Sequence, residues 1–391
     1  MRSNYQTPGV YREETVLKSA PQLQTGVAGF VGLVKAKAAS GQANEPFALN
    51  RKSDFDALFQ DKLVPGTFLA EAVNGFFLNG GIHCYVVGAA IEESADAASK
   101  EGALKAALQA LSPLTDLDLI AIPDAMTLEL ETLKRVQSEM LRHCEMSGDR
   151  MAILDALPTA SVSSLIAQRD DITTGAREPV NGALYYPWLK TNDGGLIPPS
   201  GHVAGIFSRS DARVGVFKAP ANEEVLGALD LGIRESGASK ALIVDSNLQG
   251  QLNPEGINCL RAFPGRGIRV WGARTLSRDP EWCYINVRRL VLTLRRWIDA
   301  NMAWASFEPN TPQLWVRIKR ELNVYLTELW QAGALSGQAI EEAFYVKCDS
   351  ETNPPEVREA GQTATEIGLA PGAPAEFVIV RIIHHTGVEP R

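Results

Sequence analysis

The N-terminal part of the chain alternates short apolar runs with longer segments of mixed polarity. The apolar runs are residues 25–34, 84–87, 117–122 and 151–154, and segments with helical periodicity are residues 53–60, 68–78, 95–111 and 127–147. Apolar runs of this length are typical of strands buried on both faces. Their alternation with helices predicts an α/β domain, in which helices cover both sides of a parallel sheet.

Two further segments of this part are interpreted differently from each other. Residues 236–245 continue the α/β pattern, and another buried strand is predicted at residues 241–244. Residues 175–220 are rich in glycine and proline, and we expect them to form long loops around the sheet.

The alternation stops after about residue 253, and the rest of the chain has a different pattern. Two long helices are predicted at residues 280–307 and 311–333, and three runs with strand character follow at residues 343–348, 363–369 and 377–383. We therefore place a domain boundary near residue 260, with an α/β domain before it and an α+β domain after it.

Composition and charge argue against several classes of protein. The 391 residues are 45% apolar and 21% charged, as in ordinary folded proteins, and the net charge of −8 argues against a dedicated nucleic-acid binder. There is no run of 18 apolar residues, so we expect no membrane insertion, and residues 1–9 lack the apolar core of a secretory signal. The five cysteines form no C-x-x-C pair, which predicts reduced thiols and no zinc site.

The charge is unevenly distributed along the chain. Residues 260–320 carry 12 basic and 4 acidic side chains, whereas the segments before and after are net acidic. A basic segment in an acidic protein indicates a face that meets an acidic or polar partner. The alternative is an arginine-rich helix that pairs with acidic neighbours in its own chain.

The helix predicted at residues 284–304 carries four of these basic residues on one face. At 100° per residue, Arg288, Arg289, Arg295 and Arg296 fall opposite a face formed by Val287, Leu290, Val291, Leu294, Trp297 and Ile298. We interpret the arginines as contacts for the acidic surface of another polymer. A solvated helix face is the alternative.

Candidate catalytic residues do not form a recognisable constellation. Asp155 ends a predicted strand and His202 follows it in the chain, so an Asp–His–Ser triad has to be considered. Ser208 and Ser210 lie in F-S-R-S-D, which lacks the glycines of a nucleophile turn. The glycines of residues 25–32 recur every third position, unlike those of a dinucleotide site. We predict no enzyme activity, no cofactor and no metal, and a hydrolase is the less favoured alternative.

The C-terminal end has the pattern of a strand that another subunit could take up. Residues 377–383, F-V-I-V-R-I-I, are apolar on both faces, as in a central strand, and they lie close to the chain end. They follow A-P-G-A-P at residues 370–374, which extends neither a sheet nor a helix. This arrangement favours donation of the strand into another subunit's sheet, and the alternative is that it completes its own domain.

Nine short strings, in one order over essentially the whole chain, carry a resemblance to a known family. They are T-P-G-V-Y (7–11), A-G-F-V-G-L (28–33), A-V-N-G-F-F (72–77), L-Y-Y-P-W (184–188), P-P-S-G-H-V-A-G (198–205), L-N-P-E-G-I-N (252–258), R-V-W-G-A-R (269–274), Y-I-N-V-R-R (284–289) and P-A-E-F-V-I (374–379). In these strings the sequence resembles the contractile tail sheath family of bacteriophage tails and phage-like injection machines.

The resemblance implies a structural protein rather than an enzyme. It implies a subtilisin-like α/β domain without catalysis at residues 23–260 and a C-terminal α+β sheath domain at residues 261–370. It further implies linking arms at residues 1–22 and 371–391. The chain is short for this family, which favours a minimal sheath of an extracellular injection system. A terminal sheath paralogue that caps or initiates the tube is the second alternative.

The resemblance also implies partners and site residues. Hexameric rings of identical subunits would stack around an inner tube, with baseplate and cap proteins at the ends, in a virion tail or phage-like particle assembled in the bacterial cytoplasm. The arms would add strands to neighbouring subunits, next to the strands at residues 343–348 and 363–369. The arm residues would be Pro8, Val10, Tyr11, Val16, Phe377, Val378, Val380 and Ile382, and the tube-facing residues Arg288, Arg289, Arg295 and Arg296.

Overall fold

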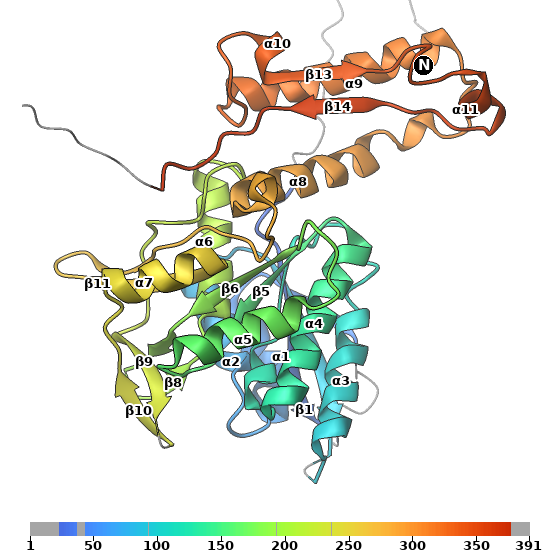
Figure 1. Ribbon diagram of the computed structural model, residues 1–391. Coiled ribbons are helices and arrows are strands. Elements are labelled where there is room, and N and C mark those ends of the chain that lie inside the picture. The colour runs from blue at the N-terminus through green and yellow to red at the C-terminus, as the bar shows by residue number, and fades with distance from the viewer. Residues whose placement is uncertain (1–22, 37–43, 93, 193, 236, 377–391) are drawn as a thin grey trace, which may run out of the picture.

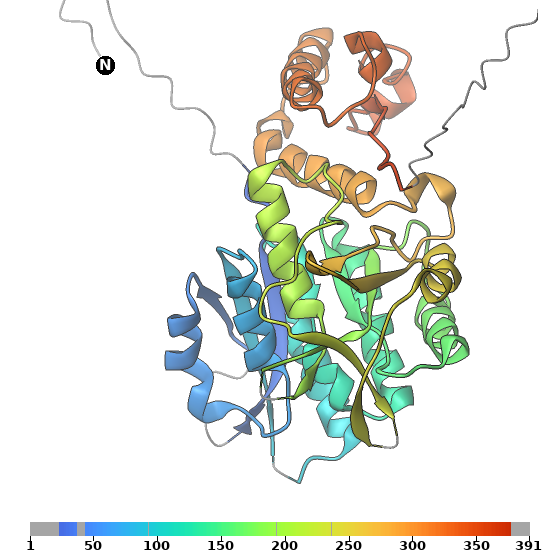
Figure 2. The same cartoon turned by 90° about the vertical axis from the view of Figure 1, so that its left-hand side faces the viewer.

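A computed structural model describes residues 23–36, 44–92, 94–192, 194–235 and 237–376. It consists of an α/β body (residues 23–276) and a smaller terminal domain (residues 302–376), shown below and above in Figure 1. Helix α8 (Ile285–Asn301) lies between the two parts in both views (Figures 1 and 2). The expectation of a mixed α/β chain is confirmed.

The core of the body is an eight-stranded sheet in the order β12-β11-β6-β5-β4-β1-β3-β2. Its strands are β1 (Ala28–Lys35), β2 (Pro46–Leu49), β3 (Cys84–Ile91), β4 (Leu119–Ala121), β5 (Met151–Asp155), β6 (Gly182–Tyr186), β11 (Ile257–Phe263) and β12 (Gly267–Val270). All neighbours are parallel except at the two edges, where β12 and β2 run antiparallel. The predicted parallel sheet is therefore present.

Strand β1 occupies a central place in this sheet, which explains its continuous apolar run. Ala28 is in register with Cys84 of β3 on one side and with Leu119 of β4 on the other. Residues 28–34 are all buried. A Cβ atom on Gly32 would lie 2.6 Å from the Cβ atom of Leu69, so the glycine allows a helix to pack directly on the strand.

Helices cover both faces of the sheet. Helices α3, α4 and α5 pack side by side on one face, and α2 and α6 lie on the other (Figures 1 and 2). The helices of the body are α1 (Lys52–Phe59), α2 (Leu69–Leu78), α3 (Ala97–Gln109), α4 (Leu130–Ser147), α5 (Val162–Thr173), α6 (Ser200–Arg213) and α7 (Ser246–Leu252). The helices expected from periodicity are confirmed, with shifts of a few residues at their ends.

The prediction of loops over residues 175–220 is wrong, because this segment contains β6 and helix α6. Two of its glycines serve close packing rather than turns. A Cβ atom on Gly201 would overlap the backbone of Ala72, and one on Gly205 would overlap the backbone of Phe76. Helices α6 and α2 therefore touch backbone to backbone, which a count of glycine and proline along the sequence does not indicate.

A second, four-stranded sheet flanks the body. Its strands, in the order β10-β9-β7-β8, are β7 (Trp188–Lys190), β8 (Leu196–Ile197), β9 (Asp230–Glu235) and β10 (Ala238–Ala241). The prediction of a buried strand at residues 241–244 is wrong, because the strand ends at Ala241 and the side chain of Ile243 is 87% exposed. Strand β10 is an edge strand and has a neighbour on one side only.

The boundary predicted near residue 260 is also too early for this sheet. It falls inside β11, which pairs in parallel with β6 through Ile257 and Leu184. Strand β12 then returns antiparallel to β11, so the sheet continues to Val270. The helix–strand alternation stops before these strands because two consecutive strands close the edge of the sheet.

The terminal domain is a long helix packed on a two-stranded antiparallel sheet. Its elements are α9 (Pro312–Gln331), α10 (Ile340–Ala343), β13 (Phe344–Lys347), α11 (Pro355–Glu359) and β14 (Glu366–Leu369). Over the described chain as a whole, short 3-10 helices also occur at Gln60–Lys62, Pro123–Thr127, Asn253–Glu255, Pro280–Trp282 and Ala303–Ala305. Leu326 of α9 packs in one core with Leu290 and Leu294 of α8. The two predicted long helices and the strands at residues 343–348 and 363–369 are confirmed.

Candidate functional site: helix α8 and the terminal sheet

Helix α8 is amphipathic, and both of its faces make contacts within its own chain. Leu290 and Leu294 point into the core of the terminal domain. The Trp297 ring stacks on Tyr325 of α9 with ring centres 4.1 Å apart. The opposite face, which carries the arginines, meets the α/β body. The helix therefore joins the two parts of the molecule through an apolar face and a charged face.

Arg289 is enclosed between α8 and the body, with 2% of its surface exposed. Its guanidinium donates to both carboxylate oxygens of Asp211, at 2.8 and 2.6 Å, and to Asp118 Oδ2 at 2.8 Å. It also lies over the Phe207 ring, 5.0 Å from the ring centre. Burial alone would lower the pKa of Arg289, but the charges of Asp211 and Asp118 raise it above its usual range. Arg289 is therefore charged at neutral pH, whereas burial raises the pKa of its partner Asp211.

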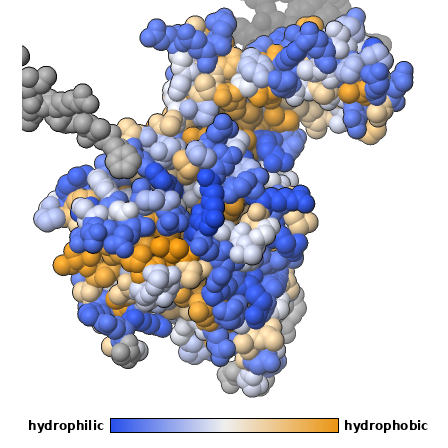
Figure 3. All heavy atoms as spheres, in the orientation of Figure 1, coloured by the Kyte–Doolittle hydropathy of each residue, from blue (hydrophilic) through white to orange (hydrophobic). Residues whose placement is uncertain are grey.

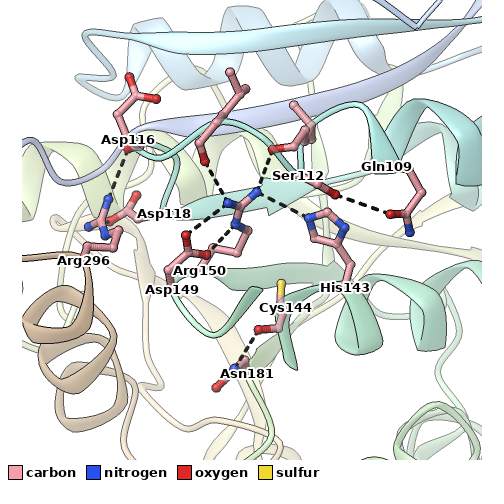
Figure 4. Close-up of polar contacts among 12 residues, drawn as sticks. Gln109, Ser112, Asp116, Asp118, His143, Cys144, Asp149, Arg150, Asn181 and Arg296 are labelled. Atoms are coloured by element: carbon pink, nitrogen blue, oxygen red, sulfur yellow. Dashed lines mark hydrogen bonds and ion pairs between the residues drawn. The ribbon is translucent and has the colours of Figure 1, made fainter. Parts of the chain in front are cut away.

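Arg296 extends the same network by about two turns of the helix. Its Nη2 atom lies 3.3 Å from Asp118 Oδ2, and Nη1 donates to the carbonyl oxygens of Asp116 at 3.2 Å and Gln24 at 3.4 Å. Figure 4 shows Arg296 of α8 pointing toward Asp116 and Asp118 of the loop before β4. One carboxylate, that of Asp118, thus receives two arginines of α8.

Arg288 is also buried, but its partner is neutral. Its Nε atom donates to Asn181 Oδ1 at 2.6 Å, and its guanidinium lies 5.1 Å from the centre of the Trp282 ring. Burial lowers the pKa of Arg288 to about 10, and the neighbouring Arg295 contributes to this shift. Asn181 in turn donates to the carbonyl oxygen of Cys144, as Figure 4 shows.

The structure therefore contradicts the prediction that Arg288, Arg289 and Arg296 face another polymer, because their own chain covers them. The physical reason is that Asp118 and Asp211, which are distant in sequence, meet this face of the helix and neutralise it. The alternative that the basic segment pairs with its own neighbours holds for Arg289 and Arg296. Of the four predicted residues, Arg295 is exposed.

A second buried charge cluster, centred on Arg150, supports the body next to this junction (Figure 4). Arg150 donates to the carbonyl oxygens of Leu111 and Leu114, both at 2.8 Å, and pairs with Asp149 at 2.7 Å. Burial, with help from the nearby Arg150 charge, lowers the pKa of His143 to about 4. This cluster was not predicted from the sequence, although an arginine directly before a buried strand is a detectable signal.

The residues considered for a hydrolase do not form a triad. Asp155 Oδ1 accepts the backbone N–H of Ser200 at 2.8 Å, and neither Asp155 nor a serine hydroxyl of the described residues bonds the His202 ring. Burial lowers the pKa of His202 to about 4, and the ring nitrogen Nδ1 is buried without a partner. A nucleophile bonded to its base is the geometric requirement of such a site. The described residues do not meet it.

Within residues 23–36, 44–92, 94–192, 194–235 and 237–376, no three His, Cys, Asp or Glu side chains lie close enough together to hold a metal ion. None of the helices described is both long enough and apolar enough to cross a bilayer.

The sheet of the terminal domain has two strands and therefore two outer edges. Strand β13 pairs with β14 from Phe344 opposite Leu369 to Lys347 opposite Glu366. An apolar groove runs between β14 and α8 and is visible as an apolar area between the two parts of the molecule in Figure 3. It is lined by Trp282, Tyr284, Val287, Val291, Leu294, Ile367 and Leu369. An unpaired strand edge beside an apolar groove can accept a further strand.

Helix α9 has an exposed face that the sequence analysis did not single out. Val316 and Val324 are more than half exposed, and Arg320 lies between them at helical spacing. Lys319 borders the same surface. The detectable signal is two valines at a spacing of eight residues on the face opposite the buried Leu322.

The predicted arm residues lie outside the described residues, so the structure does not place them. They are Pro8, Val10, Tyr11, Val16, Phe377, Val378, Val380 and Ile382, and the third predicted strand, residues 377–383, lies outside as well.

Comparison with known proteins gives consistent matches in sequence. The phage tail sheath protein central domain matches residues 97–276, and the phage tail sheath C-terminal domain matches residues 277–384. The tail sheath protein of Salmonella phage ViI is 25% identical over 233 residues, which are 57% of this chain and 35% of that protein. The matched stretch is therefore well under half of that relative's length.

Solved structures match over nearly the whole chain. A chain of the anti-feeding prophage baseplate, 6-fold symmetrised, is 27% identical, with 98% of this chain and 100% of that chain covered and a TM-score of 0.76. A chain of the sheath complex of the extracellular contractile injection system PVC, in the contracted state, is 28% identical, with coverage of 98% and 99% and a TM-score of 0.74. With two adjoining domain matches that span most of its length and this likeness in fold, the chain belongs to the contractile tail sheath family.

Proposed function

We propose that this chain is the structural sheath subunit of a contractile injection device. It polymerises around an inner tube and contracts to drive the tube through a target envelope. The observation that carries this proposal is the match of 98% of the chain to complete chains of two such devices, at 27% and 28% identity. The large phage sheath it resembles in sequence is matched over only part of its length.

The subunits form hexameric rings that stack into a cylinder, with the baseplate at one end and a cap at the other. The 6-fold symmetry of the anti-feeding prophage baseplate supports this arrangement. The α/β body is subtilisin-like in fold but has no assembled triad, since Asp155 bonds Ser200 rather than His202. The particle is a phage tail or a phage-like device assembled in the bacterial cytoplasm.

Neighbouring subunits are linked by arms at residues 1–22 and 371–391. The unpaired edges of β13 and β14 and the groove along β14 support this proposal, because an added strand gains backbone hydrogen bonds and apolar cover together. Backbone bonds of about 0.5–1.5 kcal/mol each do little more than offset the ordering of the added residues. Burial of Val378, Val380 and Ile382, at about 1.5–3 kcal/mol each, then makes the link favourable.

The inner tube is contacted by the exposed face of α9, which replaces the arginine face of α8 predicted from the sequence. The exposure of Val316 and Val324 and the basic side chains of Lys319 and Arg320 support this assignment, because they form an apolar and cationic surface that suits an acidic tube. Arg295 remains a candidate for a peripheral contact because its side chain is exposed.

Contraction is a rigid-body rearrangement. The buried pairs of Arg289 with Asp118 and Asp211 support this view, because they join α8 to the body through direct contacts of 2.8 and 2.6 Å. Each subunit can then rotate as a unit while the arms keep neighbours connected.

The test is electron microscopy of the purified protein beside a variant that lacks residues 377–391. The full chain should form long ridged cylinders, and the shortened chain should remain in small particles. A matched control is a charge change on exposed β10, such as Lys240→Gln, which should assemble normally. If the shortened chain forms normal contracting cylinders, the linking-arm proposal is wrong. Isolated rings from the full chain would instead indicate a terminal paralogue.

A further inference from the structure

The described chain ends in an ion pair with the segment that leads into α8. The side chain of Arg274 donates through Nε to the carboxylate oxygens of Glu376 at 3.0 and 3.2 Å, and through Nη2 at 2.6 Å. Their side chains are 22% and 14% exposed, so the pair is partly shielded from water. A bidentate arginine–carboxylate pair of this kind fixes the relative orientation of the two side chains as well as the distance between them.

Arg274 is itself held in place by the body. Its backbone N–H donates to Asn258 Oδ1 at 2.7 Å, which ties it to β11 of the main sheet. Its guanidinium lies 5.9 Å from the centre of the Tyr284 ring, directly before the first residue of α8. The pair therefore attaches Glu376 to a rigid part of the fold and not to a surface loop.

A second contact holds the chain four residues earlier. Asn286 of α8 is buried, and its side-chain amide donates to the carbonyl oxygens of Gly372 and Phe217, both at 2.9 Å. Between Gly372 and Glu376 the sequence is A-P-A, which offers little side-chain packing. The path of residues 373–375 is therefore fixed by the contacts of Gly372 and Glu376 on either side of them.

The N-terminal side of the described chain is held on the same helix. The carbonyl oxygen of Gln24 accepts from Arg296, and the backbone N–H of Gly26 donates to Asp118 Oδ2 at 3.1 Å. Asp118 is the carboxylate that receives both Arg289 and Arg296 of α8. Both ends of the described chain are thus tied to α8 or to the segment that leads into it.

We propose that the Arg274–Glu376 pair is a positioning contact that fixes the point at which the C-terminal arm leaves the subunit. This inference rests on the proposed function. Without the pair, the chain is next held at Gly372, and the four residues freed add about 13 Å to the arm at about 3.3 Å per residue. An arm lengthened in this way can pair with the neighbouring subunit's sheet in several strand registers. Its effective concentration at the correct register is therefore lower, and the link is less precise. With the pair intact, a force on the arm is transmitted through Arg274 to β11 and α8.

The experiment compares the full chain with Glu376→Ala, with Arg274→Glu, and with the exchanged pair Arg274→Glu/Glu376→Arg. Sedimentation measures the subunit concentration at which half of the protein is in sheaths, and electron microscopy measures the integrity of contracted sheaths. Each single variant should raise that concentration about tenfold, as expected for loss of a charge-assisted contact worth about 1.4 kcal/mol, and its contracted sheaths should break into short pieces. The exchanged pair should restore most of both properties. Glu235→Ala, which removes an ion pair with Lys240 elsewhere on the surface, is the matched control and should change neither.

The outcomes separate this inference from the proposed function. If the full chain forms no sheath, the proposed function is wrong. If the full chain forms sheaths and Glu376→Ala assembles at the same concentration and contracts into intact cylinders, the positioning role is wrong and the function stands. If a single variant unfolds at a lower temperature as a monomer, the exchanged variant distinguishes lost stability from lost positioning. An exchanged variant that is stable but whose sheaths still break on contraction overturns the inference.

Discussion

Replacement of Arg289 by methionine tests the interpretation of the α8 junction most directly. Methionine fills a similar volume but removes the three hydrogen bonds to Asp211 and Asp118. It leaves two buried carboxylates without this cation, and breaking a buried ion pair from one side typically costs about 3–5 kcal/mol. Against a total stability of about 5–15 kcal/mol, this loss is large. We expect urea unfolding of the monomer, followed by tryptophan fluorescence at pH 7, to show it as a lower midpoint.

Two further variants make the test specific. Arg295→Ala, on the exposed side of the same helix, should change the free energy of unfolding by less than about 0.5 kcal/mol. Arg289→Met combined with Asp211→Asn should regain part of the loss, because residue 211 is then neutral and Asp118 still pairs with Arg296. The interpretation fails if Arg289→Met costs less than about 1 kcal/mol, or if Arg295→Ala costs as much.

Three other predictions follow from burial and close packing. Gly201→Ala should lower stability by about 1–3 kcal/mol in thermal unfolding, since its methyl group would overlap the backbone of Ala72, and unchanged stability would refute the close contact. Burial lowers the pKa of His202 from 6.5 to about 4 on folding. The stability gained with this ring neutral is therefore complete above pH 6.5, and about 3 kcal/mol of it is lost as the pH falls to 4. His202→Asn should make the free energy of unfolding depend less on pH in this range, and an unchanged slope would contradict the burial. Leu326→Ala should cost about 2–5 kcal/mol and increase hydrogen exchange in the terminal domain before the main sheet, whereas uniform exchange would indicate a single cooperative unit.

Patterns in the sequence predicted the strands and helices in which buried positions recur at a regular spacing along the chain. The run at residues 28–34 is apolar throughout because both neighbours of β1 are strands and helices cover both faces, so every position is buried. The same reasoning predicted helices α3 and α4 and the strands β13 and β14. It failed at helix α6, where Gly201 and Gly205 serve contact with another helix rather than turns.

The alternation of buried strands and helices up to β5, the amphipathic character of α8 and the likeness to tail sheaths were determined by the sequence alone, because each depends on residues near one another in the chain. The direction in which the arginines of α8 point was decided only by the tertiary structure. Asp118 and Asp211 approach Arg289 from two distant parts of the chain, and a helical wheel shows a charged face without showing what covers it. The meeting of Arg274 with Glu376 has the same cause, because folding alone brings these side chains together.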